Sequence, residues 1–216
     1  MKNQSQRFLK PTYFFDYDAD IIQQLILEFN KPHLTNKAKA IELYLKVRDG
    51  WTYDPYQISL SKANYRSSQI AQKPFGNCVE KSILLIAGLR AMNIPARLHL
   101  GKVKNHIAAE RLIRKFGSDE LTPHGMVNVY LNNKWLKLSP AFNASLCHKF
   151  KVAPLDFDGE NDSYLQAYNN DGTRFMEYTA DYGYFEDVPL DFMKNNVKKH
   201  YPHIFDTSGP ITEFRL

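Results

Sequence analysis

Two residues of this chain have the side chains and the local sequence that covalent catalysis requires. Cys78 follows Gly76 and Asn77 and precedes a run of apolar residues, and His124 opens a segment in which apolar and polar residues alternate. In nucleophilic catalysis an imidazole takes the proton of a thiol, and the thiolate attacks a carbonyl carbon. The pair therefore predicts acyl chemistry on a cysteine.

The residues around Cys78 predict that it lies at the start of a helix. Asn77 is a good N-cap residue, and Glu80 follows it at the capping-box spacing. At the first helical position, free backbone N–H groups and the helix dipole favour a thiolate. We also expect Gly76 to permit a tight turn and the approach of a substrate carbonyl. The alternative is a buried cysteine that acts only as a small hydrophobe.

The segment from His124 to Leu131 predicts a strand with His124 at its start. Val127, Val129 and Leu131 fall on one face and His124 on the other. Residues 132–134 supply a turn and residues 135–138 a second strand, so the two form a hairpin. Ser139 follows this hairpin and is placed to reach back to His124. The alternative is an ordinary surface hairpin with a capping histidine.

These segments together resemble the transglutaminase-like superfamily. The resemblance rests on Gly76-Asn77-Cys78 and Asn93-Ile94-Pro95-Ala96-Arg97 within residues 75–97, and on His124 with the strand residues after it. It implies an α+β, papain-like fold in which a helix-borne cysteine packs against an antiparallel sheet. It also implies that Cys78 is the nucleophile and His124 the base. The core would span residues 35–145, and residues 139–143 and 154–159 resemble an uncharacterised bacterial branch.

One position departs from the family pattern. Ser139 precedes Pro140 where the superfamily usually has an aspartate that orients the imidazole. A neutral amide fills this role in papain-like enzymes, so Ser139 is a candidate third member of a catalytic triad. Other residues that could orient His124 are Asn143, Asp156, Asp158, Asp162 and Asp181.

Length and composition predict one domain over residues 1–216, with an elaboration over residues 150–216. The formal net charge is +5, but the basic residues are scattered and no recognition motif accompanies them, so we do not expect nucleic-acid binding. The polar start of the chain and its short apolar runs predict a cytoplasmic protein without a membrane span. Cys147 is then a buried or incidental thiol.

The rest of the chain predicts further elements of an α+β layout. We expect helices near residues 20–29, after Thr35 and at 107–116, a strand at 96–103, and an irregular connection at 53–74 that could wall a cleft. Beyond Pro154 the periodicity is too weak for assignment. The closest pair of metal-binding side chains, His200 and His203, flanks a proline, and no metal or cofactor motif is present, so none is expected.

The resemblance implies a cysteine peptidase or amidase that forms a thioester on Cys78, with a peptide or protein amide as substrate, because bacterial proteins of this kind and size look more like proteases than like cross-linking enzymes. The Cys78 N–H would help to hold the oxyanion, together with a second donor from residues 53–74. Two alternatives remain open. One is a transglutaminase-type transferase that passes the acyl group to an amine, and the other is a binding protein that has lost its chemistry with the triad aspartate.

Overall fold

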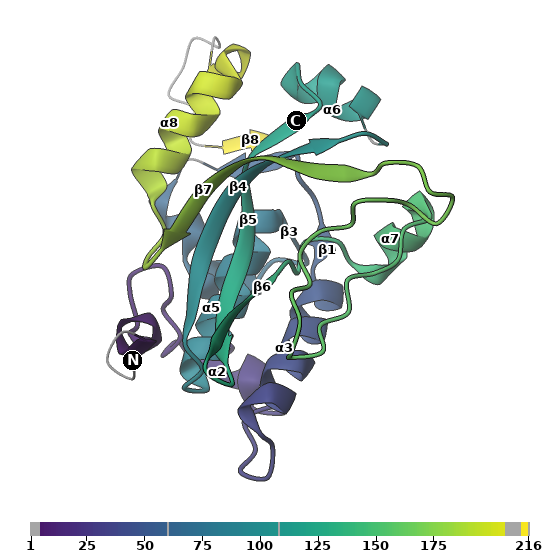
Figure 1. Cartoon of the computed structure of the whole chain (residues 1–216). Helices are drawn as coiled ribbons and strands as arrows, with labels where there is room; N and C mark the ends of the chain where they lie inside the picture. Colours follow the sequence, from purple (N-terminus) through teal and green to yellow (C-terminus); the bar gives the residue numbers. More distant parts are fainter. Residues whose placement is uncertain (1–4, 60, 108, 206–212, 216) are drawn as a thin grey trace.

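The fold is described from a computed structural model that defines residues 5–59, 61–107, 109–205 and 213–215 (Figure 1). The α-helices are α2 (Asp20–Ile26), α3 (Asn36–Gly50), α4 (Ser67–Ala71), α5 (Cys78–Ala91), α6 (Ala109–Phe116), α7 (Ala144–Phe150) and α8 (Leu190–His200). The strands are β1 (Thr52–Tyr53), β2 (Gln57–Ser59), β3 (Phe75–Gly76), β4 (Ala96–Asn105), β5 (Glu120–Leu131), β6 (Lys134–Leu138), β7 (Met176–Phe185) and β8 (Glu213–Arg215). Short 3-10 turns are η1 (Gln6–Leu9), η2 (Lys62–Tyr65) and η3 (Pro202–Phe205).

The centre of the fold is an antiparallel sheet with the strand order β6-β5-β4-β7. Apolar residues at alternate positions of its central strands, such as Leu98, Val127 and Val129, are fully buried against α5. Helices α2, α3 and α4 contact α5 from the side away from the sheet (Figure 1). This arrangement confirms the α+β prediction of a cysteine-bearing helix packed against an antiparallel sheet.

Helix α5 lies in the core along nearly its whole length, with every residue from Cys78 to Arg90 buried. Gly88 lets it approach its neighbours, because a Cβ there would lie 2.7 Å from a methyl carbon of Leu43. The helix ends at Ala91, and Asn93 adopts a left-handed conformation with φ of 61°. Pro95, two residues further on, cannot continue the helix.

Strand β5 begins earlier than predicted. It starts at Glu120, so His124 lies inside the strand rather than at its head. Pro123 cannot donate to a sheet ladder, yet pairing with β4 resumes beyond it at Leu121 and Glu120, after a register shift between Gly101 and Val103. The hairpin itself is confirmed: Leu131 pairs with Lys134, and Asn132 and Asn133 both have positive φ, as a two-residue type I′ turn requires.

The connection over residues 53–74 is more ordered than expected. It contains β2, η2 and α4, and it is bracketed by the parallel pair β1 and β3, which places Tyr53 beside Gly76. In the C-terminal part, β7 forms an edge of the sheet and α8 packs against β5. These elements surround the end of α5 that carries Cys78.

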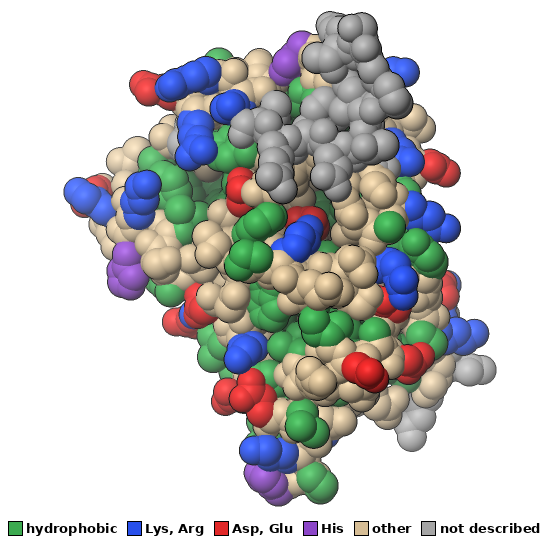
Figure 2. Space-filling view, turned by 180° about the vertical axis from the view of Figure 1, so that it is seen from behind, with side chains coloured by type: hydrophobic (Ala, Val, Ile, Leu, Met, Phe, Trp, Pro, Cys, Tyr) green, Lys and Arg blue, Asp and Glu red, His purple; other side chains and the backbone are tan. Residues whose placement is uncertain are grey.

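Acidic and basic side chains are interspersed over much of the face in Figure 2, as the scattered charges of the sequence predicted. Near the upper left of that view, hydrophobic side chains line a hollow that has several Lys and Arg side chains around it. Within the described ranges, no helix combines the length and apolarity needed to cross a membrane.

Candidate active site

The capping box predicted for Cys78 is present. The Asn77 side-chain oxygen accepts hydrogen bonds from the N–H groups of Val79 and Glu80, both at 3.0 Å, and Glu80 Oε2 accepts one from the Asn77 N–H at 3.0 Å. Lys73 also pairs with the Glu80 carboxylate. Cys78 is therefore fixed at the first position of α5. Gly76 does not form the expected tight turn: it lies in β3, and the space beside its Cα is filled by the Lys81 side chain.

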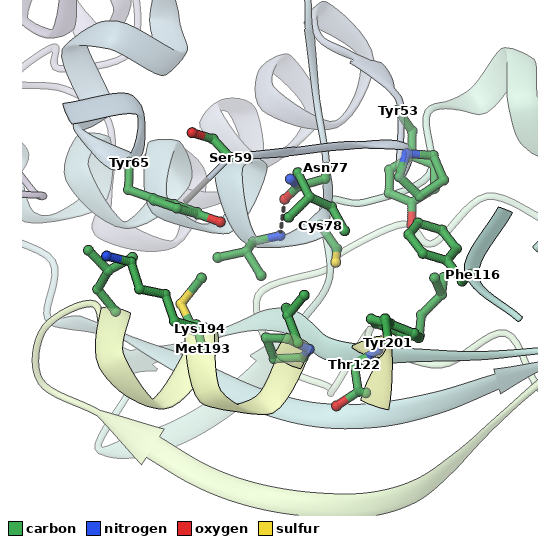
Figure 3. Close-up of a pocket in the computed structure, with 17 residues that line it drawn as sticks. Tyr53, Ser59, Tyr65, Asn77, Cys78, Phe116, Thr122, Met193, Lys194 and Tyr201 are labelled. Carbon is green, nitrogen blue, oxygen red and sulfur yellow. Dashed lines mark hydrogen bonds between the residues drawn. The ribbon is translucent and has the colours of Figure 1, made fainter. Parts of the chain in front are cut away.

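The Cys78 side chain is only 7% exposed and borders a narrow cavity. Figure 3 shows the sulfur pointing away from Tyr65, toward the side where Tyr53, Phe116 and Tyr201 lie. Helix α8 covers the cavity with a row of side chains, among them Leu190, Met193, Lys194 and Val197.

Burial dominates the ionisation of this thiol. It raises the pKa of Cys78 to about 11, against the opposing effect of the backbone N–H groups of Gly125, Val79 and Cys78 itself. The helix N-terminus thus lowers the pKa of Cys78 as expected. Desolvation of the sulfur by the side chains around it raises the pKa by more. In the structure described here, Cys78 is a neutral thiol at neutral pH.

His124 reaches the vicinity of Cys78 through the packing of β5 on α5. A Cβ on the next residue, Gly125, would lie 2.7 Å from Val79 Cα and 3.0 Å from the Cys78 carbonyl oxygen. Only glycine allows the strand and the helix to approach this closely. The backbone beside His124 therefore touches the first turn of the cysteine helix.

The imidazole of His124 is enclosed and neutral. Its side is contacted by the Tyr178 ring, whose centroid lies 5.9 Å away, and burial lowers the pKa of His124 to about 4. Its Nδ1 atom has no hydrogen-bond partner within the described part of the chain. Among the described residues, no hydrogen bond joins the Cys78 sulfur to His124.

Ser139 and His124 line the same small cavity, which they share with Gln166. The Ser139 hydroxyl accepts a weak hydrogen bond from the Ala141 N–H at 3.5 Å, and it makes none to His124 among the described residues. Tyr44 holds this segment by donating a 3.0 Å hydrogen bond to the Ser139 carbonyl. Ser139 is thus near the imidazole without orienting it in this arrangement.

The other residues considered as partners of His124 have contacts of their own. Asn143 accepts from the Tyr53 N–H, and its amide donates to Ser145. The four carboxylates pair with different groups: Asp156 with Arg48, Asp158 with Asn161 and the turn around it, Asp162 with the Lys137 N–H, and Asp181 with His99. Gln166 in the shared cavity, which the sequence did not single out, is a further neutral candidate; its amide nitrogen donates to the Ala153 carbonyl at 2.6 Å.

A buried lysine, Lys81, connects three segments around the site, and sequence reasoning did not identify it. Lys81 Nζ donates to the carbonyl oxygens of Arg48, Trp51 and Ala141 at 2.7–2.8 Å, and burial lowers its pKa to about 7. It thereby joins α5 to the segments before Tyr53 and after Ser139. The signal in the sequence was a lysine two positions before the apolar run at residues 83–87 of this helix.

Tyr53 is a second residue whose role the sequence did not show. Its hydroxyl is buried without a hydrogen-bond partner among the described residues, and its ring borders the cavity beside Cys78. Burial raises the pKa of Tyr53 well above its ordinary value, and a thiolate formed at Cys78 would raise it further.

Comparison with known proteins assigns the chain to a family. The model of the transglutaminase-like superfamily matches residues 23–140, a range that includes Cys78, His124 and Ser139. A search of curated proteins gives no match. A solved structure, titled a "putative cysteine protease" from Cytophaga hutchinsonii, is similar with a TM-score of 0.55 and 15% identity over 89% of this chain.

The matched region covers 50% of that Cytophaga chain, so the present chain spans about half of its length. At this identity the likeness concerns the fold, and the match to the family model is the finding that assigns the chain. At the level of the family, that assignment supports a cysteine-dependent enzyme. The chain belongs to the transglutaminase-like superfamily.

Proposed function

We propose that the protein is a cysteine-dependent amide or peptide hydrolase in which Cys78 is the nucleophile and His124 the base. One observation carries this proposal: Gly125, the residue after His124, packs closely against the first turn of the helix that presents Cys78. In addition, three backbone N–H groups surround the sulfur, where a thiolate would be stabilised.

Both groups are neutral at neutral pH, so the proposed reaction is general-base catalysis rather than attack by a preformed thiolate. His124 takes the thiol proton as the Cys78 sulfur attacks the amide carbon, and the C–N bond then breaks as His124 returns the proton to the leaving amine. Water, deprotonated by His124, attacks the resulting thioester. The C–S bond breaks, the carboxylic acid leaves, and the thiol is restored.

Two donors are available for the oxyanion of the tetrahedral intermediate. The first is the Cys78 N–H at the start of α5, and the second is the hydroxyl of Tyr53, which has no hydrogen-bond partner among the described residues. A buried donor without a partner lowers the stability of the free enzyme. It is, however, already positioned to stabilise a negative charge that develops only during the reaction. Tyr53 is the first residue of the 53–74 segment from which the second donor was expected.

Ser139 is the proposed orienting residue for His124, because it lines the same cavity and lies where the family usually has aspartate. A hydroxyl polarises the imidazole less than a carboxylate does, in keeping with the lowered pKa of His124.

The test follows the fate of the acyl group in a glutamine-containing peptide. The protein is incubated with the peptide and a fluorescent primary amine, and mass spectrometry records ammonia loss, new amino termini and amine incorporation. A new amino terminus or deamidation that disappears in Cys78→Ala supports the hydrolase. Incorporation of the amine in preference to water would instead establish the transferase.

The non-catalytic alternative is favoured by the buried neutral thiol and by the missing aspartate. It predicts no thioester under any condition. Rapid mixing with an activated p-nitrophenyl ester separates this alternative from the others, because acylation of Cys78 shows as an added mass on its peptide. Absence of that adduct in the natural chain, with folding intact, would overturn the proposed function.

A further inference from the structure

A large groove lies next to the cysteine cavity. It offers about 850 Å³ of space, against about 50 Å³ beside Cys78, so a peptide segment fits the groove but not the cavity. Its walls come from β1, from α6 and the residues before it, and from α7.

The groove and the cavity share a wall made of Tyr53, Pro55 and Leu121. The Cys78 sulfur points toward the side of its cavity where Tyr53 lies (Figure 3). A chain bound along the groove therefore reaches the nucleophile once the side chains of this wall move aside. The proposed oxyanion donor, Tyr53, sits at the same boundary.

The floor of the groove is apolar and aromatic. Its rings include Tyr53, Tyr56, Phe75, Phe142 and Phe150. These rings pack on one another in part: Tyr53 meets Phe142 edge to face at 4.8 Å between centroids. Such a surface favours an apolar side chain of a bound peptide near the shared wall.

The rim of the groove is basic. Arg111, Arg114 and Lys149 line it and are exposed, and the Arg111 guanidinium lies 4.3 Å from the Tyr56 ring centroid. Neither Arg114 nor Lys149 forms an ion pair or a side-chain hydrogen bond with any residue that the structure describes. Figure 2 shows Lys and Arg side chains gathered around the hollow at its upper left.

Two acidic residues also line the groove, and they offset the positive charge of its rim only in part. Asp54 is occupied by hydrogen bonds from the Tyr56 N–H and the Gln57 amide, at 3.0 and 2.8 Å. Glu110 is exposed and neighbours Arg111 on α6. The unpaired cations of α6 and α7 thus remain available for an anionic ligand.

We propose that this groove binds an acidic peptide segment, with an apolar residue on the aromatic floor and carboxylates at the Arg111, Arg114 and Lys149 rim. This rests on the proposed function, since it identifies the substrate class of the same site. Guanidinium groups bind carboxylates with two parallel hydrogen bonds, so two arginines on one helix suit carboxylates spaced along a chain.

The test measures binding without catalysis, using the Cys78→Ala protein. The probe is a dansylated hexapeptide, Glu-Leu-Gln-Phe-Glu-Gly, and the comparison probe has Gln in place of each Glu. We expect the acidic probe to bind more tightly and to lose this preference as salt rises from about 50 to 500 mM, because exposed charges are screened. Replacing Arg111, Arg114 and Lys149 together by Gln should weaken its binding by about 3- to 10-fold.

The matched control replaces Lys31 and Lys134 by Gln, since both are exposed and outside the groove. Binding of the acidic probe should be unchanged in this control. Equal affinity for the two probes, or an unchanged affinity in the rim variant, would overturn the proposal. Because the assay uses a protein without the nucleophile, its failure is distinct from a failure of the hydrolase proposal, which the ester experiment reports.

Discussion

The sharpest prediction concerns how alkylation of Cys78 by iodoacetamide changes with pH. A buried thiol with a pKa of about 11 should react only through the rare thiolate, so its rate should rise roughly tenfold per pH unit between about pH 6 and 10. An ordinary thiol with a pKa of about 8.5 levels off within this range.

Two opposing factors determine how much more slowly Cys78 should react at pH 7 than an ordinary thiol. The thiolate fraction is about 10⁻⁴ for a pKa of about 11 and about 3% for a pKa of about 8.5, a difference of roughly 300-fold. The more basic thiolate is roughly 10- to 15-fold more nucleophilic. Cys78 should therefore react about 20- to 30-fold more slowly than glutathione, and its 7% exposure slows it further.

The assay quantifies the alkylated peptide by mass spectrometry, with glutathione as the reference. Cys147 does not serve as an ordinary thiol, because its side chain is fully buried. His124→Ala should leave the tenfold rise per pH unit unchanged, because a neutral imidazole does not stabilise the thiolate, and circular dichroism at each pH verifies folding. A plateau below pH 7 with a rate above that of glutathione, reduced in His124→Ala, would refute the reasoning and establish a thiolate–imidazolium pair.

The same alkylation assay tests whether α8 limits the access of reagents to Cys78. Met193→Ala with Val197→Ala removes apolar side chains that border the cavity, and it should raise the alkylation rate at every pH. The control Lys198→Ala changes an exposed residue of the same helix that does not border the cavity. An equal rate in both variants would show that another element limits access to the sulfur.

Four further substitutions test the site. Gly125→Ala places a Cβ 2.7 Å from Val79 Cα and should lower the free energy of unfolding by about 1–3 kcal/mol in urea titrations, whereas Gly50→Ala meets nothing within 4 Å and should not destabilise. Lys81→Met leaves three buried carbonyls without their donor and should cost about 3 kcal/mol in the same titrations; a loss below about 1 kcal/mol would contradict its proposed role. Ser139→Asp should raise the pKa of the nearby imidazole and the alkylation rate at pH 6, and equal rates in Ser139→Asp and Ser139→Ala would show that another group orients it. Tyr53→Phe should lower kcat by about 10²-fold without loss of stability, because it removes an oxyanion donor that is unpartnered in the free enzyme; unchanged kcat would remove Tyr53 from the mechanism.

Local sequence signals were sufficient for the elements that carry the site. The Asn77 and Glu80 capping box fixed the start of α5, and the paired asparagines fixed the turn after β5. These features depend on backbone conformation and on hydrogen bonds between residues a few positions apart. The family resemblance related Cys78 to His124 and to position 139, where Ser139 stands in place of the usual aspartate. The structure places Cys78 beside the backbone next to His124, and His124 and Ser139 line one cavity.

Only the tertiary structure decided the chemical state of those residues. The helix N-terminus predicted an ionised Cys78, but side chains of α8, more than a hundred positions later in the chain, bury the thiol and keep it neutral. The roles assigned to Lys81 and Tyr53 likewise depend on partners or surroundings supplied by distant segments. Desolvation and hydrogen bonding between distant segments depend on which segments pack together in the folded chain. Local residue patterns do not determine that packing.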